Sequence, residues 1–293
     1  MNINSSLSHR GQEPEKGILY LVGTPIGNLS DISSRALNIL KNVSLVACED
    51  TRQTKKIMNK YQICNTLMSF NQTNKKKKIP QIIKLLKESN AVALVSDAGM
   101  PSICDPGEEL AREAKMNEIE IICIPGASAV LTALVSSGYP SSKFIFEGFL
   151  PKKTVLRKKM LLEISQNEKT TIFFEAPHRL KKTLIELREF CGGKREITVT
   201  KELTKKFEKH IGSNIDEVIR YFENEKVLGE FTIVVKGISN DSNNEMNKLI
   251  LREELYELTN AGLNLSAASK YLAKKNNISK SIIYNLYKPI KNF

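Results

Sequence analysis

Three short motifs in the 293-residue chain place a carboxylate beside a cation directly after an apolar run: Cys48–Arg52 (CEDTR), Phe173–Arg179 (FFEAPHR) and Lys201–Lys205 (KELTK). Such a carboxylate can accept a proton, and the cation can stabilise an oxyanion that forms during a reaction. Structural roles are the alternative, because aspartates often cap helices and surface ion pairs contribute little to stability. Together the motifs favour a cleft that binds a polar, anionic substrate.

Three further segments combine glycine and proline after apolar runs: 23–28 (GTPIGN), 96–107 (SDAGMPSICDPG) and 125–129 (PGASA). Glycine permits positive φ and a close backbone approach, whereas proline fixes the chain and removes a donor. Any one segment can be a plain tight turn, but three together favour loops that present backbone groups to a ligand. The sequence lacks the usual glycine-rich phosphate motifs, so it predicts an adenosine-like ligand without a polyphosphate.

The elements that position these loops follow from the hydrophobic pattern. Amphipathic helical segments alternate with apolar runs at 17–23, 43–48, 66–70, 91–95 and 119–124. This alternation predicts a mostly parallel sheet with helices on both faces. Ligands of such sheets bind outside the carboxyl ends of the strands, where the three loops are expected to cluster.

The second half of the chain predicts another α/β unit. Its helices are expected at 153–166, 178–190 and 214–225, and its strands at 144–150, 170–176, 195–203, 205–212 and 229–237. A polar stretch at 238–247 is expected to be a linker, followed by three short helices that resemble a helix-turn-helix pattern. The expected organisation is a disordered leader (1–16), an N-terminal α/β cofactor domain (17–138), a second α/β domain (139–240) and a C-terminal helical domain (246–293).

Composition restricts the partners and the compartment. The net charge of +12 indicates either solvated lysine faces in a Lys- and Asn-rich chain or a polyanionic partner, most simply nucleic acid. The five scattered cysteines predict reduced thiols in a cytoplasm, and the three histidines are too far apart in sequence to suggest a zinc site. Apolar runs are too short to cross a bilayer, so no membrane partner is expected.

The motifs occur in an order that resembles the tetrapyrrole methylase superfamily: GTPIGNLSDISSRAL, CEDTR, VSDAGMPSICDPGEEL, IPGASAVLTALVSSG, FEGFLP, FFEAPHR, KELTK and GEFTIVVKG. The resemblance extends from Gly17 to Gly237, and the helical tail is also similar. Within the superfamily it is closest to the branch that methylates ribosomal RNA. Departures from the usual pattern are Met100 for threonine, Ala176 for serine and Lys201 for arginine.

This resemblance implies two α/β domains with S-adenosylmethionine bound in the cleft between them, commonly in a homodimer. It implies methyl transfer to the ribose 2′-hydroxyl of a cytidine in the decoding region of 16S rRNA, in the small ribosomal subunit. Two alternatives stay open. One is a methylase of the same superfamily that acts on a tetrapyrrole or a diphthamide precursor, and the other is a non-catalytic nucleic-acid-binding protein.

Candidate site residues follow from the resemblance together with the motifs. Possible bases are Asp50, Glu175 and Glu202, and possible stabilising cations are Arg52, Arg179 and Lys201; the transfer requires no metal. Lysine at 201 puts in doubt a role that needs a bidentate guanidinium. The cofactor is expected to contact Pro25, Asp97, Gly99, Pro101, Ile103, Ala127, Ser128, Ala129, Glu230, Phe231 and Thr232.

Overall fold

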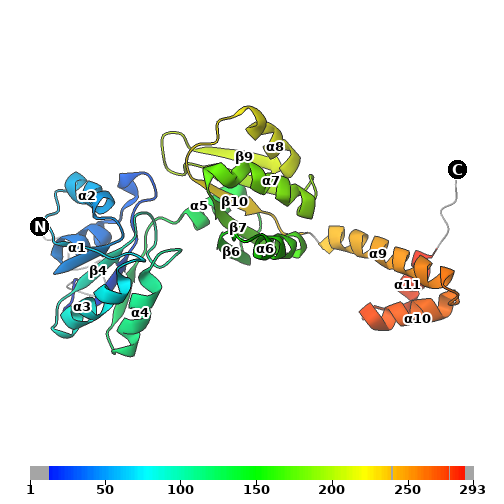
Figure 1. Ribbon diagram of the computed structural model, residues 1–293, viewed down its shortest axis with the longest axis horizontal. Helices are drawn as coiled ribbons and strands as arrows, with labels where there is room; N and C mark the ends of the chain where they lie inside the picture. Colours follow the sequence, from blue (N-terminus) through cyan, green and yellow to red (C-terminus); the bar gives the residue numbers. More distant parts are fainter. Residues whose placement is uncertain (1–12, 239, 277, 288–293) are drawn as a thin grey trace, which may run out of the picture.

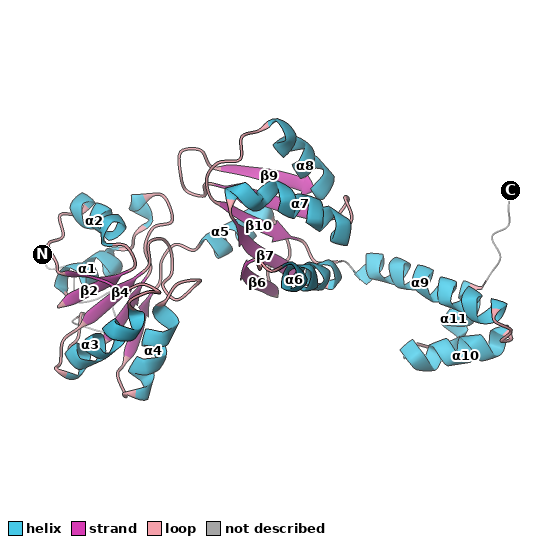
Figure 2. Cartoon of the chain, in the orientation of Figure 1, coloured by secondary structure: helices cyan, strands magenta, loops and turns pink. Residues whose placement is uncertain are grey.

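The computed structural model describes residues 13–238, 240–276 and 278–287. Figure 1 shows two α/β units followed by a separate group of C-terminal helices, and Figure 2 shows the same chain by secondary structure. Most of the expected leader, residues 1–12, lies outside the described residues. The part that is described is held to the first unit, because Glu13 accepts a hydrogen bond from Arg35 at 2.6 Å.

The first sheet is entirely parallel. Its strands are β1 (Leu19–Val22), β2 (Leu45–Cys48), β3 (Leu67–Ser69), β4 (Val92–Val95) and β5 (Ile121–Ile124), in the order β3-β2-β4-β1-β5. Every residue of β2 and β4 is buried, as expected for strands covered on both faces. The parallel sheet predicted from the apolar runs is confirmed.

Helices cover both faces of this sheet. One core contains α1 (Ser34–Asn42) and α2 (Thr51–Lys60), and the other contains α3 (Lys75–Lys87) and α4 (Gly107–Met116). The chain therefore leaves the neighbouring strands β1 and β4 toward opposite faces of the sheet. After β1 it forms the short helix η2 (Leu29–Asp31) and α1 on one face, and after β4 it forms α4 on the other. Such a divergence opens a crevice at the carboxyl ends of the two strands.

The second sheet is mixed. It contains β6 (Phe144–Phe149), β7 (Thr170–Glu175), β8 (Glu196–Lys201), β9 (Lys209–Asn214) and β10 (Phe231–Val235), in the order β6-β7-β10-β8-β9. Only β6 and β7 pair in parallel. The second α/β unit is confirmed, but the strand predicted at 205–212 is displaced, because residues 202–208 form a tight loop and β9 begins at Lys209.

Two different layers cover the second sheet. On one face lie α6 (Thr154–Gln166), α7 (Pro177–Cys191) and α8 (Ile215–Asn224). On the other face lies α5 (Ala129–Ser137), whose Val130, Ala133 and Leu134 pack against Ile172 and Val234. Since α5 starts in the loop after β5, it connects the two sheets directly (Figure 1).

The C-terminal unit has a small core of its own. Helices α9 (Asn240–Asn260), α10 (Leu265–Asn276) and α11 (Lys280–Leu286) bury Leu251, Leu255, Ala268, Leu272 and Ile283 among them. The stretch predicted as a polar linker at 238–247 is mostly helical, since α9 begins at Asn240. Among the described helices, none is long and apolar enough to span a bilayer.

Candidate active site

The loops at the carboxyl edge of the first sheet are locked to one another. Thr24, after β1, and Gly99, after β4, exchange two backbone hydrogen bonds of 2.9 and 3.1 Å. The loops after β1 and β5 are closer still, because a Cβ on Gly23 would lie 2.7 Å from the Cα of Gly126. Glycine is required at both positions, because a side chain would not fit between the two loops. The structure thus confirms that the three glycine- and proline-containing loops cluster, as expected from the sequence.

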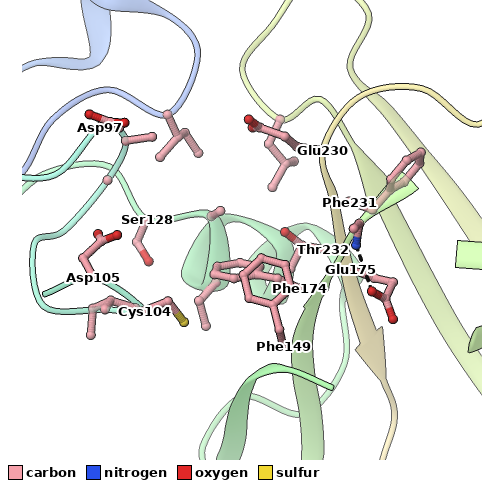
Figure 3. Close-up of a pocket in the computed structure, with 18 of the residues that line it drawn as sticks. Asp97, Cys104, Asp105, Ser128, Phe149, Phe174, Glu175, Glu230, Phe231 and Thr232 are labelled. Carbon is pink, nitrogen blue, oxygen red and sulfur yellow. Dashed lines mark hydrogen bonds between the residues drawn. The ribbon is translucent and has the colours of Figure 1, made fainter. Parts of the chain in front are cut away.

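A cavity of about 480 Å³ lies between these loops and the second sheet (Figure 3). The first unit contributes the loop from Asp97 to Asp105 and the start of α5. The second unit contributes the end of β7 and residues 229–232, which lead into β10. The rings of Phe149 and Phe174, 5.5 Å apart, form one wall. The volume is in the range of pockets that enclose a small organic ligand.

Charge in this cavity has a single sign. Asp97, Asp105 and Glu230 line it with carboxylates, and none of the described residues that line it is lysine, arginine or histidine. Glu175 also lines it, but its carboxylate is fully buried behind the wall and is paired with Arg179. In Figure 3, Asp97 and Asp105 face the cavity from one side and Glu230 from the other. A site of this kind favours a ligand that carries positive charge and disfavours a polyphosphate.

Acidic side chains crowd the ends of β2 and β4. Burial is the main cause that raises the pKa of Asp105, and the negative charge of Glu49 adds to it, so that this pKa reaches about 7. Burial likewise raises the pKa of Glu49 and, to a lesser degree, so does the charge of Asp97. Asp105 is therefore about half protonated near neutral pH.

A second, polar recess of about 410 Å³ adjoins the cavity and shares Asp97 with it. Asp50 caps α2 by accepting the N–H of Arg52 at 2.8 Å, and the Arg52 guanidinium donates to its carboxylate at 3.0 and 2.6 Å. These hydrogen bonds lower the pKa of Asp50 to about 2. At neutral pH, Asp50 is thus a weak base that is already paired.

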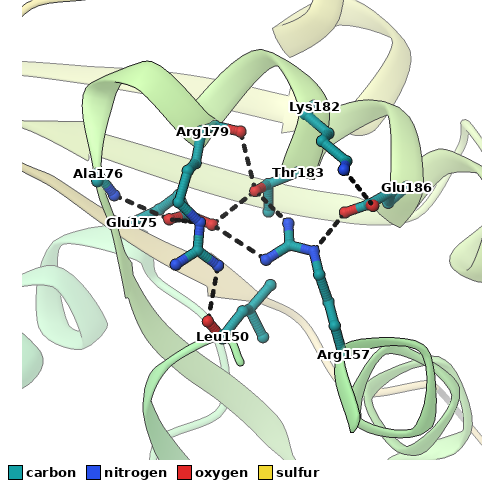
Figure 4. Close-up of polar contacts among 8 residues, drawn as sticks. All are labelled: Leu150, Arg157, Glu175, Ala176, Arg179, Lys182, Thr183 and Glu186. Carbon is teal, nitrogen blue, oxygen red and sulfur yellow. Dashed lines mark hydrogen bonds and ion pairs between the residues drawn. The ribbon is translucent and has the colours of Figure 1, made fainter. Parts of the chain in front are cut away.

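The Glu175 carboxylate is fully buried and surrounded by donors (Figure 4). One oxygen accepts the Ala176 N–H at 2.9 Å and lies 3.1 Å from Nε of Arg179; the other accepts the Thr183 hydroxyl at 2.6 Å. Arg179 also donates to the carbonyl of Leu150 at 2.6 Å. This network ties β7 to α7 and to the end of β6 behind the cavity wall.

Glu202 connects two loops of the second unit. One of its oxygens accepts both Nζ of Lys205 and the N–H of Glu230, each at 2.9 Å, and Lys205 also donates to the Glu230 carboxylate at 2.9 Å. Burial tends to raise the pKa of Glu202, but the hydrogen bonds from Lys205 and Glu230 outweigh it and the pKa is lowered. Glu202 therefore fastens the segment that carries Glu230 into the cavity.

Comparison with known proteins agrees with this architecture. The sequence profile described as "Tetrapyrrole (Corrin/Porphyrin) Methylases" matches residues 18–219, which contain the first sheet and nearly all of the second unit before β10. The chain belongs to the tetrapyrrole methylase family.

Several curated relatives of this methylase carry the name "Ribosomal RNA small subunit methyltransferase I". The protein from Bacillus subtilis is 41% identical over 289 residues, which cover 97% of this chain and 98% of the relative. The one from Synechocystis is 41% identical over 270 residues, with coverage of 92% and 97%. The one from Thermotoga maritima is 47% identical over 221 residues, which cover 75% of this chain but 99% of that relative.

Solved structures share the fold of the methylase at low identity. A cobalt precorrin-4 methyltransferase superposes with a TM-score of 0.60 at 16% identity, over 75% of this chain and 95% of the other. A uroporphyrin-III C-methyltransferase from Thermus thermophilus, complexed with S-adenyl homocysteine, has a TM-score of 0.52 at 16% identity, with coverage of 74% and 96%.

The methylase brings most of its sequence-predicted cofactor residues to one place. Those that line the cavity are Asp97, Gly99, Ile103, Ser128, Ala129, Glu230, Phe231 and Thr232. Pro25 and Ala127 are not among the lining residues, and Pro101 lines a small neighbouring recess that also contains Glu49 and Asp105. These roles stay predictions.

The predicted catalytic residues of the methylase are dispersed. Glu175 lines the cavity, Asp50 and Arg52 line the adjoining recess, and Arg179 and Glu202 line neither. Within the described part of the chain, no three His, Cys, Asp or Glu side chains gather as a possible metal site.

Sequence reasoning missed several lining residues of the methylase, namely Ile26, Cys104, Asp105, Val130, Phe149, Phe174 and Leu203. Asp105 stands in the same Gly- and Pro-containing segment as Asp97, so the argument that selected Asp97 could have found it too. The aromatic residues carried no local signal, because an apolar side chain at a strand end is equally suited to the core.

Proposed function

We propose that this methylase transfers the methyl group of S-adenosylmethionine to the ribose 2′-hydroxyl of a cytidine in the decoding region of 16S rRNA. The observation that carries the proposal is the cavity, which is large enough for a nucleoside-sized ligand and lined by carboxylates without a cation. The names of the relatives at 37–47% identity support small-subunit rRNA as the substrate.

The lining of the cavity fits the donor in size and in charge. When bound, S-adenosylmethionine supplies an electrophilic methyl group on a positively charged sulfonium. Asp97 from the first unit and Glu230 from the second would attract its positive groups, and the aromatic wall of Phe149 and Phe174 would contact its apolar and cationic parts. Gly99 has φ of +80° and leaves its backbone free of a side chain at the cavity.

The adjoining recess is suited to the acceptor nucleotide. Asp97 borders both spaces, and its pKa is raised, first by burial and then by the charge of Asp50, whereas the pKa of Asp50 is about 2. Asp97 is therefore the stronger base of the two and the better candidate to orient or deprotonate a ribose hydroxyl. Arg52 would contact an RNA phosphate. Alignment of the hydroxyl with the methyl carbon can account for ~7–11 kcal/mol of the barrier.

Charge outside the cavity supports an RNA substrate. The chain carries a net charge of +12, although the cavity itself is acidic, so the positive charge is available to phosphates at the surface. Binding to the subunit is then expected to weaken steeply with salt. All five cysteines are free thiols, which accords with a cytoplasmic location.

A homodimer is part of the proposal. Leu131 and Val135 lie one turn apart on α5 and are 52% and 77% exposed, and Val155 and Leu156 at the start of α6 are also exposed. Large apolar side chains that are exposed next to one another, as Leu131 and Val135 are on α5, mark an interface with another protein, here a second copy. Light scattering should give twice the chain mass, and Val135→Glu should shift it toward one chain mass.

Methylation of purified small subunits tests the function. We expect incorporation of labelled methyl from S-adenosylmethionine, at a cytidine whose 3′ linkage then resists alkaline cleavage because the 2′-oxygen is blocked. Incorporation only into a porphyrinoid or a diphthamide precursor would favour a small-substrate methylase. RNA binding without any calorimetric heat from the donor would favour a non-catalytic reader.

A further inference from the structure

The loop between β8 and β9, residues 202–208, forms one rim of the cavity. Leu203 lines the cavity itself. The next residue, Thr204, reaches the first unit, since its hydroxyl accepts the N–H of Asn28 at 3.0 Å. At Gly27, a Cβ would lie 2.4 Å from Cγ of Lys205, so the two units touch here with no room for a side chain. The loop is therefore held between both units at the mouth of the site.

Hydrogen bonds inside this loop fix its shape. Glu208 accepts the backbone N–H of Thr204 at 2.6 Å, and Lys205 is held by two carboxylates, those of Glu202 and Glu230. Glu202 and Thr204 have φ of +52° and +65°, a conformation that residues with a Cβ seldom adopt. Such conformations persist only where the surroundings enforce them, and they concentrate at functional sites.

The fixed loop presents an aromatic ring and a cation to solvent. Phe207 is 66% exposed, and Nζ of Lys206 lies 5.6 Å from the centroid of its ring. Lys206 has no carboxylate partner among the described residues. The acids of the loop, in contrast, are engaged, because Glu202 is paired with Lys205 and Glu208 lies 2.7 Å from His210. The tip is thus apolar and positively charged.

We propose that Phe207 stacks on a base of the RNA strand that enters the cavity, while Lys206 contacts a phosphate of the same strand. This inference rests on the proposed RNA substrate. Sequence-tolerant stacking on an aromatic ring beside a cation is how proteins hold unpaired nucleotides, and a ribose can reach an enclosed methyl donor only in such a strand. Lys206 and Phe207 are not among the residues that line the cavity, so they would hold the strand beside it without contacting the donor.

Substitution at 207 tests the stacking. We expect Phe207→Ala to raise the KM for small subunits about tenfold, because loss of one base–aromatic stack weakens binding by roughly five- to 150-fold. The kcat at saturating subunit and the calorimetric affinity for S-adenosylmethionine should change less than twofold. Phe207→Tyr should restore the KM, whereas Phe207→Leu should not, since leucine has similar bulk without a ring. Met116→Ala, at an exposed apolar residue of α4, is the matched control.

Other results would overturn the inference. An unchanged KM in Phe207→Ala, or full rescue by leucine, would remove the stacking role while methylation by the unaltered protein still upheld the proposed function. If light scattering gave Phe207→Ala half the mass of the unaltered protein, the ring would contact a second copy of the chain instead of a base. Absence of methylation by the unaltered protein would instead count against the proposed function itself.

Discussion

The backbone N–H of Asp50 donates to Oδ1 of Asp97 at 2.9 Å, which joins the end of β2 to the end of β4. This contact places Asp97 between the acidic cavity and the polar recess that contains Arg52. The residue can therefore influence both the methyl donor and the acceptor, and its substitution is the most informative single change at the site.

We expect Asp97→Asn to weaken the binding of S-adenosylmethionine about tenfold, which corresponds to ~1.4 kcal/mol. The asparagine oxygen can still accept from the Asp50 N–H, so the fold and the melting temperature should be retained while the charge is lost. Isothermal calorimetry gives the affinity, and Asp31→Asn, at an exposed carboxylate of η2, is the control. Equal affinity in the two variants would exclude Asp97 from the donor site.

The raised pKa of Asp105 predicts a pH-dependent stability. Between about pH 4 and about pH 7 the folded protein binds a proton that the unfolded chain has released, so the free energy of unfolding falls as pH rises through this window. Asp105→Asn removes the ionised form. We expect it to be more stable than the unaltered protein at pH 8 by ~1–2 kcal/mol, after allowance for partial solvent screening, and to differ little at pH 4.

Urea unfolding at pH 4, 6 and 8 measures this difference. The advantage of Asp105→Asn should grow with pH and level off above about pH 7. An advantage that is constant over the whole range would mean that packing, and not ionisation, separates the two proteins.

The contact between Gly23 and Gly126 predicts a steric penalty. A Cβ at residue 23 would lie 2.7 Å from both the Cα of Gly126 and Sδ of Met100, so Gly23→Ala must move two loops apart. We expect a loss of ~1–3 kcal/mol in the free energy of unfolding, together with weaker donor binding. Gly138→Ala is the comparison, because a Cβ there meets nothing within 4 Å and the cost comes only from its φ of +69°. Donor affinity should be normal in that variant.

The buried network around Glu175 predicts a structural role for this carboxylate. Glu175→Gln would leave Arg179 without its carboxylate partner and Arg157 with Glu186 alone, at a cost of ~3–5 kcal/mol. Thermal unfolding should show a large decrease in midpoint. Below that midpoint, kcat per folded molecule should remain within a few-fold of normal; a drop of a hundredfold or more would show instead that the carboxylate takes part in the transfer.

The apolar runs and their spacing were sufficient to predict the parallel sheet, since a strand that is buried on both faces consists of consecutive apolar residues. The Gly- and Pro-containing loops could likewise be predicted from the sequence, because their special backbone conformations require those residue types. The strand predicted at 205–212 begins at Lys209 instead, for the converse reason. Its apolar and charged pattern suits a strand, but hydrogen bonds to Glu202, Glu208 and Glu230 bend the first part of it into the rim loop.

Only the tertiary structure decided which charged residues act together. The CEDTR, FFEAPHR and KELTK motifs look alike as sequence, yet their carboxylates have different roles. Asp50 lines a recess, Glu175 is buried among hydrogen-bond donors, and Glu202 holds a loop through a hydrogen bond. The pKa of Asp105 depends on burial and on Glu49, which precedes it by 56 residues. Local patterns record periodicity and backbone preference, whereas burial and the identity of a charged neighbour depend on chain segments that meet only after folding.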